Sequence, residues 1–311
     1  MRKLGMLLAG LGGFLVVLAL LGKVYAPGAL MKTPLDVDSV TNAAGEAAVG
    51  SDSTAPVKGT QITRSDSAKS DDDVVVFVSS SCLIFDRDDA PACVAADDPD
   101  ERLITASVDD FATDRVSAMA VNDPKYLPPE AAPRDGLQNK WPFDVEKKTY
   151  PYWDDTAGQV VNAEYDGTED IDGVETYKFH AVLSDVPIEV TDGIQGTYSN
   201  DKTIWIEPVT GSIVNQSYHM EQVTDDGANF ITLDLAFTED EVQDSIDDAK
   251  SNRDKLNLVR NTVPLIGFIV GIPLLLVGTV LTMRGGRGGG STKKKTLPAD
   301  ETAGRRPATD T

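Results

Sequence analysis

The sequence predicts an α+β membrane protein, in which an antiparallel β-rich extracytoplasmic domain lies between an N-terminal and a C-terminal transmembrane helix. Two observations predict this class. An uninterrupted apolar run occurs near each end of the chain, and the region between the runs alternates between short apolar strands and Asp- and Gly-rich turns. The 311 residues are enough for one sizeable domain between two such helices.

The first apolar run extends from Leu4 to Leu21 and is flanked on both sides by basic residues. As a helix it would be about 27 Å long, close to the hydrocarbon thickness of a bilayer. The alternative is a cleaved signal peptide, but the run is long for one, and cleavage after Ala26 would leave Pro27 behind the cut. We therefore predict an uncleaved transmembrane helix over residues 4–22.

The second apolar run extends from Thr262 to Met283 and contains no charged residue. Its two prolines are tolerated in a membrane helix, where neighbouring helices satisfy the freed carbonyls. We predict a transmembrane helix over residues 261–283 and a disordered basic tail over 284–311. The positive-inside rule places this tail and residues 1–3 in the cytoplasm. The chain is thus predicted to be a multi-pass cell-membrane protein with both termini cytoplasmic and residues 23–260 extracytoplasmic.

Small residues at four-residue spacing occur in both predicted helices: Ala9 with Gly13, and Gly267 with Gly271. Such pairs allow helix backbones to approach closely. They are compatible with packing of the two helices of one chain, with pairing of protomers, and with the general abundance of glycine in membrane helices.

The region between the helices is strongly acidic. Residues 24–259 hold 47 acidic and 17 basic side chains, and hence a net charge of −30. A surface of this sign repels nucleic acid and anionic lipid headgroups and attracts cations or basic partners, so we predict no nucleic-acid binding. The simpler alternative is that the acidity reflects a source that favours acidic protein exteriors.

The first part of the central region is rich in small and polar residues. Residues 36–73 have few large apolar side chains and are predicted to be a flexible loop. The run Val74–Val78 then suits a buried strand. Cys82 and Cys93, the only cysteines, flank a turn-like segment. In an extracytoplasmic domain we expect them to form a disulfide, with metal binding as a weaker alternative.

From residue 159 the pattern becomes that of an antiparallel meander. Residues 174–183 alternate as a half-buried strand, and Asp225-Asp226-Gly227 turns the chain between strands at 212–223 and 229–237. We interpret Asn200-Asp201 as a two-residue hairpin turn between short strands at 194–199 and 202–207. A capping box at Thr238 and Glu241 then predicts a membrane-proximal helix over 239–260.

Catalytic chemistry finds little support in the sequence. The two histidines, His180 and His219, fall on predicted strands, and no nucleophile elbow, phosphate loop or zinc spacing occurs. The segment Asp166–Gly173 resembles a calcium loop, but Phe179 stands where a bidentate Glu is needed, so a β-turn explains it better. We predict no enzyme activity, no cofactor and no metal.

An aromatic and proline-rich stretch is the candidate ligand site. Two prolines and five aromatic side chains fall within fourteen residues, although aromatics make up only 6% of the chain. Proline disfavours central sheet positions, so these rings are expected on rigid extended segments. They either plug one end of a β core or line an aromatic groove for an apolar ligand. The candidate ligand-binding residues are Trp141, Phe143, Tyr150, Tyr152 and Trp153.

Three motifs carry a family resemblance: Trp141-Pro-Phe143 with Glu146-Lys-Lys-Thr-Tyr-Pro-Tyr-Trp-Asp154, Asp172-Gly-Val-Glu-Thr-Tyr-Lys-Phe179, and Ile204-Trp-Ile-Glu-Pro-Val-Thr-Gly211. Over its whole length the chain resembles the PorA porin family of actinobacterial two-pass envelope proteins. The resemblance implies an actinobacterial source with a lipid-rich outer envelope layer, and it supplies no catalytic residues. The residues themselves lack the strand pattern of a transmembrane barrel, so a pore would need an oligomer of helices.

Three functions are therefore considered. The first is a non-enzymatic envelope protein whose β domain binds or transfers an apolar or lipid ligand, or scaffolds an envelope partner. The alternative is a PorA-family porin or channel formed by homo-oligomerisation of the helices. The third is a sensor that couples the domain to the basic tail through the 239–260 helix.

Overall fold

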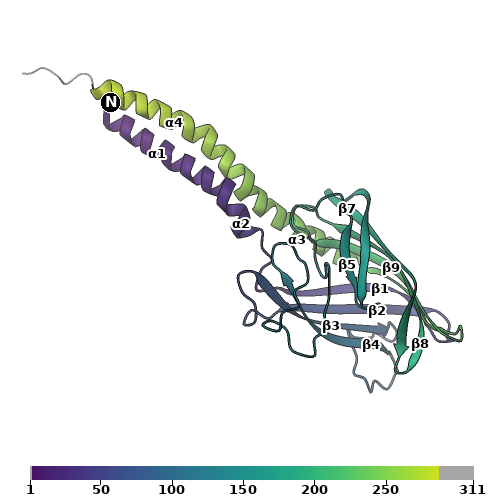
Figure 1. Cartoon of the computed structure of the whole chain (residues 1–311). Helices are drawn as coiled ribbons and strands as arrows, with labels where there is room; N and C mark the ends of the chain where they lie inside the picture. The colour runs from purple at the N-terminus through teal and green to yellow at the C-terminus, as the bar shows by residue number, and fades with distance from the viewer. Residues whose placement is uncertain (1, 287–311) are drawn as a thin grey trace, which may run out of the picture. The chain divides into compact units, whose positions relative to one another are not determined.

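The computed structural model describes residues 2–286, and it divides the chain into two compact units. One unit contains the two terminal helices, from residues 1–22 and 263–311, and the other contains residues 23–262 (Figure 1). Met1 and residues 287–311, which include most of the predicted basic tail, lie outside the described residues.

The helical unit consists of α1 (Arg2–Leu20) and α4 (Val263–Gly286). Both are long and apolar enough to cross a membrane, and most of their large side chains, such as Leu7 and Ile269, are exposed. Membrane insertion and the orientation of the termini remain predictions. Pro273 is accommodated inside α4.

Small residues bring α1 and α4 together. Gly5 and Gly12 are buried, and a Cβ on Gly5 would lie 2.7 Å from the Thr282 hydroxyl. A Cβ on Gly12 would collide with the backbone of α4, where Gly271 is a neighbour. Of the alternatives left open by the sequence, packing of the two helices of one chain is therefore present, with Gly12 rather than Gly13 at the closest contact. We name these contacts the glycine seam.

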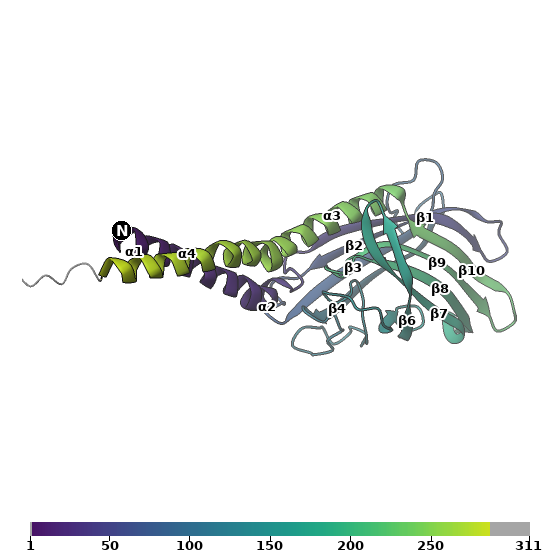
Figure 2. The same ribbon diagram turned by 90° about the horizontal axis from the view of Figure 1, so that it is seen from above.

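The second unit begins with a π-helical turn η1 (Leu21–Tyr25), of which residues 23–25 belong to this unit, and a short helix α2 (Ala26–Leu30). Ten antiparallel strands then form one sheet in the order β4-β3-β2-β1-β10-β9-β8-β7-β6-β5 (Figure 2). The strands are β1 (Asp38–Val49), β2 (Ala55–Ser65), β3 (Val74–Phe85), β4 (Leu103–Asp114), β5 (Tyr150–Asp154), β6 (Gln159–Ile171), β7 (Val174–Thr191), β8 (Ile194–Ile206), β9 (Ile213–Thr224) and β10 (Asn229–Phe237).

The prediction of a flexible loop over residues 36–73 is wrong, because β1 and β2 form a hairpin there. Several of their paired residues are small: the register pairs Gly45 with Val57 and Ala43 with Gly59. The side chain of Leu235 packs over Gly59, where a Cβ would lie 3.3 Å from it. Low hydrophobicity thus reflects the space that larger neighbours need, rather than a lack of order.

The predicted turn at Asn200-Asp201 is also wrong. Strand β8 runs without interruption through both residues, and they pair with Met220 and His219 of β9. Asn200 is buried, and its amide donates to the carboxylate of Asp154 at 3.1 Å. A polar pair inside the sheet therefore produced a false hairpin signal.

The sheet curls into a half-barrel. Lys202 of β8 and Tyr152 of β5 are separated by two intervening strands, or about 14 Å along a flat sheet. The Lys202 Nζ nevertheless lies 5.2 Å from the centre of the Tyr152 ring. The sheet must therefore bend around the face that carries both side chains, and we call this the concave face.

Two short segments join the edge strands β4 and β5 at one end of the half-barrel. The first segment, residues 119–121, pairs with β4, and the second, residues 136–137, pairs with β5. One hydrogen bond links the two segments to each other. The bonds are Asp114 N to Met119 O (2.9 Å), Val121 N to Ala112 O (2.8 Å), Ala120 N to Gly136 O (2.9 Å), Leu137 N to Pro151 O (2.8 Å) and Trp153 N to Leu137 O (2.9 Å). Backbone hydrogen-bonding groups of both edge strands are thus paired at this end of the half-barrel.

Helix α3 (Glu239–Asn257) packs on the opposite, convex face, where Ile246 and Ala249 contact Val174. As the capping box predicts, the Thr238 hydroxyl accepts a hydrogen bond from Glu241 N at 3.2 Å. The Glu241 carboxylate, however, accepts from the backbone of Asn42 in β1 and so ties the helix to the sheet. The helix ends three residues earlier than predicted, and a π-helical turn η2 (Leu258–Thr262) follows.

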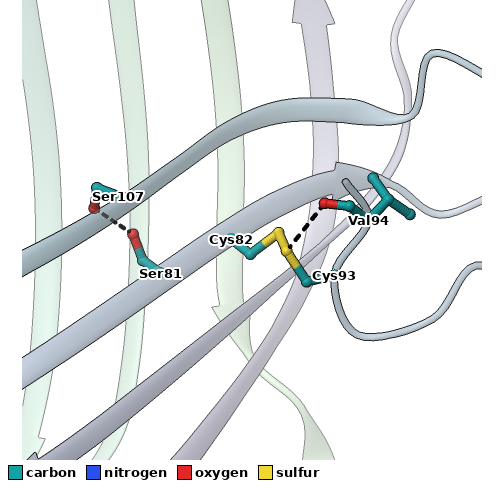
Figure 3. The surroundings of a disulfide bond; sticks show 5 residues. All are labelled: Ser81, Cys82, Cys93, Val94 and Ser107. Atoms are coloured by element: carbon teal, nitrogen blue, oxygen red, sulfur yellow. Dashed lines mark hydrogen bonds between the residues drawn. A yellow bond between two sulfur atoms is a disulfide. The ribbon is translucent and has the colours of Figure 1, made fainter. Parts of the chain in front are cut away.

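The predicted disulfide between Cys82 and Cys93 is confirmed (Figure 3). It ties the loop after β3 back onto the strand, with a sequence separation of 11 residues. Closing a loop of this size typically stabilises a fold by about 2–4 kcal/mol.

Candidate functional site

The five aromatic residues singled out from the sequence divide into a buried and a half-buried set. Trp141, Tyr150 and Tyr152 are buried in the largest apolar cluster of the half-barrel. The Trp141 ring lies 5.4 Å from that of Tyr152 and 5.5 Å from that of Phe179. These contacts match the alternative in which the rings fill the β core, and a ligand role for the five residues stays a prediction.

The other two rings are half-buried and contact charged side chains. The Lys140 ammonium lies 3.6 Å from the centre of the Phe143 ring, and the Trp153 indole donates to Asp155 at 3.0 Å. Burial lowers the pKa of Lys140 to about 7, against the attraction of Glu207. The amine also donates to the carbonyl of Thr210 at 2.8 Å.

Two of the motifs that carry the family resemblance contact each other. Trp141 N donates to Gly211 O at 2.8 Å, and Val145 N donates to Pro208 O at 2.7 Å. Gly211 has a φ of +74°, and a Cβ there would collide with the carbonyls of Trp141 and Pro142. The Pro208–Gly211 turn therefore positions the aromatic segment against the sheet.

Lys202 occupies the middle of the concave face. Its Nζ lies 5.2 Å from the ring centres of both Tyr152 and Tyr218. Tyr152 belongs to the largest apolar cluster of the half-barrel, which contains Trp141 and Phe179, whereas Tyr218 packs against a second apolar cluster. The buried members of this second cluster, which we name the aliphatic cluster, are Ala47, Val57, Leu83, Ile231, Leu233 and Leu235. The ammonium thus stands where two apolar regions meet.

Lys202 has no carboxylate oxygen within 4.0 Å among the residues that the structure describes. Burial disfavours its charged form, but Tyr152, Asp154 and Tyr218 favour it more strongly, so its pKa is raised above the ordinary value. The raised pKa favours the ammonium form of the side chain. Cations held over aromatic faces in this way are stabilised by the ring quadrupoles.

Asp154 is the nearby buried acid, and its oxygens are already engaged. One oxygen accepts from the Tyr198 hydroxyl and from the Asn200 amide, both at 3.1 Å, and the other accepts from Ala157 N at 2.9 Å. Burial and the adjacent carboxylate of Asp154 raise the pKa of Tyr198. The Oδ1 of Asn200 is buried without a hydrogen-bond partner in the described structure.

Arg134 ties the two ends of the sheet together on the same face. It is 8% exposed, and its guanidinium lies 3.3 Å from Asp109 of β4 and 3.0 Å from Asp155, which follows β5. It also stacks over the Phe111 ring at 5.2 Å. Because its charge is balanced by two carboxylates, Arg134 acts as a clamp, whereas Lys202 has no such partner among the described residues.

The arrangement thus places a positive charge on the concave face beside the aliphatic cluster. Sequence reasoning missed Tyr198, Asn200 and Lys202, because the turn placed at Asn200-Asp201 separated residues that share one strand face. The sequence did contain a signal for one continuous strand: Tyr198, Asn200 and Lys202 alternate in step with the buried residues Ile204 and Ile206, which lie on the same face of β8.

The other sequence candidates lie on the surface. His180 pairs with Asp201 at 2.7 Å, and His219 pairs with Asp234 at 2.8 Å. The calcium-like segment forms the turn between β6 and β7, where Asp170 accepts from Gly173 N at 2.9 Å. Within residues 2–286 no group of three or more His, Cys, Asp or Glu side chains is placed to hold a metal ion.

Comparison with known proteins gives one family. Residues 4–280 match the family described as Porin PorA. A Porin PorA of Corynebacterium amycolatum is 25% identical over 171 residues, which cover 39% of this chain and 44% of that protein. A Porin PorA of Corynebacterium resistens is 23% identical over 310 residues, covering 68% and 73%. The chain thus spans less than half the length of the first relative.

Among solved structures, a DUF1329 family protein from Desulfovibrio piger is similar over 73% of this chain and 90% of its own. The TM-score is 0.20 and the identity 13%, values too low to carry an argument about fold or function.

Proposed function

The chain belongs to the PorA porin family, and from this premise we propose that it is a non-enzymatic envelope protein whose half-barrel binds an amphipathic anion. The observation that carries the proposal is Lys202, a charged ammonium between two tyrosine rings with no carboxylate partner among the described residues. The apolar part of the ligand would lie against the aliphatic cluster. Two apolar terminal helices support a site close to a membrane.

A half-buried lysine without an ion-pair partner is costly unless an anion or water compensates it. The domain's negative charge repels small free anions at long range, but this field is screened beyond roughly 8 Å at physiological ionic strength. Apolar contact therefore has to supply much of the affinity, which favours a ligand with a hydrocarbon chain over a small ion.

The test uses the full chain in detergent and the fluorescent fatty acid 11-dansylundecanoic acid. We expect saturable binding, and Lys202→Gln should weaken it at least tenfold while leaving binding of the corresponding neutral alcohol unchanged. Lys178→Gln removes the same charge from the convex face, where Lys178 pairs with Asp166 at 3.0 Å, and should have no effect. Equal affinity of the wild type and Lys202→Gln for the acid would contradict the proposal.

The second candidate is a channel formed by homo-oligomerisation, and family membership favours it. The convex face is unsuited to crossing a membrane as a β-barrel, because strands β1, β9 and β10 would expose the carboxylates of Glu46, Glu221 and Asp234 to lipid. Pore formation would therefore fall to the helices. In α4, the hydroxyls of Thr279 and Thr282 donate to the carbonyls of Leu275 and Gly278 of the same helix, at 2.6 and 2.7 Å.

Planar-bilayer recording on the purified full chain tests the channel directly. Stepwise conductance that scales with protein concentration would support it, and a record indistinguishable from detergent alone would end it. Chemical cross-linking of the same preparation reports whether an oligomer is present to form a pore.

A further inference from the structure

Strands β6 and β7 separate part of the way along their length. Their register runs from Ile171 opposite Val174 to Glu164 opposite His180 and ends there. Beyond that point residues 159–163 of β6 pair only with β5, while β7 from residue 181 pairs only with β8. We call the gap between residues 159–163 and residues 181–183 the fork.

A hollow of about 450 Å³ occupies the fork, within the range of about 300–1,000 Å³ typical of ligand sites. Its lining comes from both strands: Val160, Val161, Asn162, Glu164, His180, Val182 and Leu183. Successive residues of a strand point to opposite faces, so a space that touches three successive residues runs along the strand edge. The hollow therefore lies between the two strands, in the plane of the sheet.

Backbone groups of both strands point into this hollow. The carbonyl of Pro151 and the amide of Trp153 bond to Leu137, on the outer side of β5. In an antiparallel pair the residues opposite them, Asn162 and Val160, then direct their own N–H and C=O away from β5. That direction is toward β7. On β7, His180 pairs with Glu164 of β6, and every second residue of a strand directs its backbone groups to the same edge, so the N–H and C=O of Val182 point toward β6.

These inward groups have no strand partner, since the β6–β7 register ends before them. The valines beside them are unusually accessible for strand residues, with Val160 37% and Val182 46% exposed. Water satisfies such an edge in the free protein, but an extended polypeptide satisfies it on both sides at once. Strand addition of this kind is an established mode of peptide recognition.

The side chains of the fork define what an inserted strand would carry. Val161 and Leu183 lie on the concave side, where Val161 is buried, and they suit apolar residues. Glu164 is exposed on the other side, within a domain of net charge −30, and it suits basic residues. Alternation of the inserted strand would therefore place apolar residues inward and basic residues outward.

We propose that the fork between β6 and β7 is a docking site for an extended peptide segment of a partner protein with alternating apolar and basic residues. The proposal does not depend on the proposed amphipathic ligand, although the fork adjoins that site, because Val161 of the fork pairs with Tyr152. A second copy of this chain is the competing occupant, and it would bring an acidic surface against Glu164.

The test measures binding of a fluorescein-labelled hexapeptide of alternating valine and lysine to the full chain in detergent. Asn162→Pro and Val182→Pro each remove an inward N–H without removing a bond to β5 or β8. Each should weaken binding at least tenfold, whereas Asn162→Ala and Val182→Ala keep the N–H and should bind within about twofold of the wild type. Thermal unfolding of all four variants identifies any that fails to fold.

A second arm needs no variant. The same peptide, methylated on alternate backbone nitrogens, keeps its charge and side chains but loses its N–H donors toward one of the two strands, and its binding should be weakened at least tenfold. On binding of the parent peptide, hydrogen exchange should slow at residues 159–163 and 181–183. Equal binding of the methylated peptide would overturn the proposal in favour of adsorption to an acidic surface. A change of oligomeric state in the proline variants would overturn it in favour of self-association.

Discussion

At the scale of single residues, the buried amine of Lys140 makes a prediction about pH. Its pKa is lowered to about 7, whereas in the unfolded chain it would be about 10.4. Between these values the unfolded chain binds a proton that the folded chain does not, so stability rises with pH across this window. At pH values below about 7 the folded protein carries the full cost of burying the ammonium.

Lys140→Met should therefore flatten the dependence of stability on pH. We expect the free energy of unfolding of the wild type to rise relative to that of the variant by up to about 3 kcal/mol between pH 6.5 and 9.5. Loss of the hydrogen bond to Thr210 offsets part of the gain at low pH. Urea unfolding followed by tryptophan fluorescence measures both curves. Lys255→Met, at an exposed lysine, is the control, and parallel curves for wild type and Lys140→Met would refute the expectation.

Individual residues also show what the sequence could and could not predict. The cysteine pair was predictable because compartment and spacing both pointed to a disulfide, and Cys82 and Cys93 form it. Lys202 was not predictable, because its significance depends on Tyr152, three strands away in the sheet. Strand alternation shows which side chains share a face, but only the curl of the sheet shows which of them meet.

At the scale of elements, the glycine seam predicts a sharp difference between neighbouring glycines of α1. A Cβ on Gly12 would collide with the backbone of α4, whereas a Cβ on Gly10 would meet nothing within 4 Å. Gly12→Leu should therefore separate the helices, and Gly10→Leu should leave them paired. Overpacking of this kind typically costs about 1–3 kcal/mol.

The pairing can be followed by cross-linking and by thermal stability in detergent. In Gly12→Leu we expect the helices to become more accessible to protease and their melting to broaden. The matched variant Gly10→Leu adds the same side chain two residues away. If both variants behaved like the wild type, close packing at Gly12 would not be what holds α1 and α4 together.

Elements also differed in how well their pattern predicted them. Strands at 174–183 and 229–237, and the helix at 239–260, show strong periodicity, and all three are present. The second strand has the predicted ends, the helix ends three residues early, and the first strand extends eight residues further, to Thr191. The β1–β2 hairpin was missed because its inward residues, among them Ala43, Gly45 and Gly59, are small. Larger side chains from β3 and β10 cover them, and that complementarity cannot be recognised within either segment alone.

At the scale of the whole molecule, the distribution of charge predicts which side of the membrane each part occupies. Positive charge is concentrated beyond residue 283, and the 24–259 region carries a net charge of −30. Moving a strongly acidic, disulfide-bonded domain into the cytoplasm would oppose both the positive-inside rule and the reducing chemistry there. We therefore expect the half-barrel outside and the basic tail inside.

Single cysteines report this arrangement, because the native pair is oxidised and no other cysteine is present. Ser67→Cys lies in the exposed turn after β2, and Ser291→Cys lies in the tail. A membrane-impermeant maleimide should label the first in intact cells and the second only after permeabilisation. The mass of the purified chain, 33.3 kDa if α1 is retained, tests cleavage in the same samples. Labelling of Ser291→Cys in intact cells would place the tail outside.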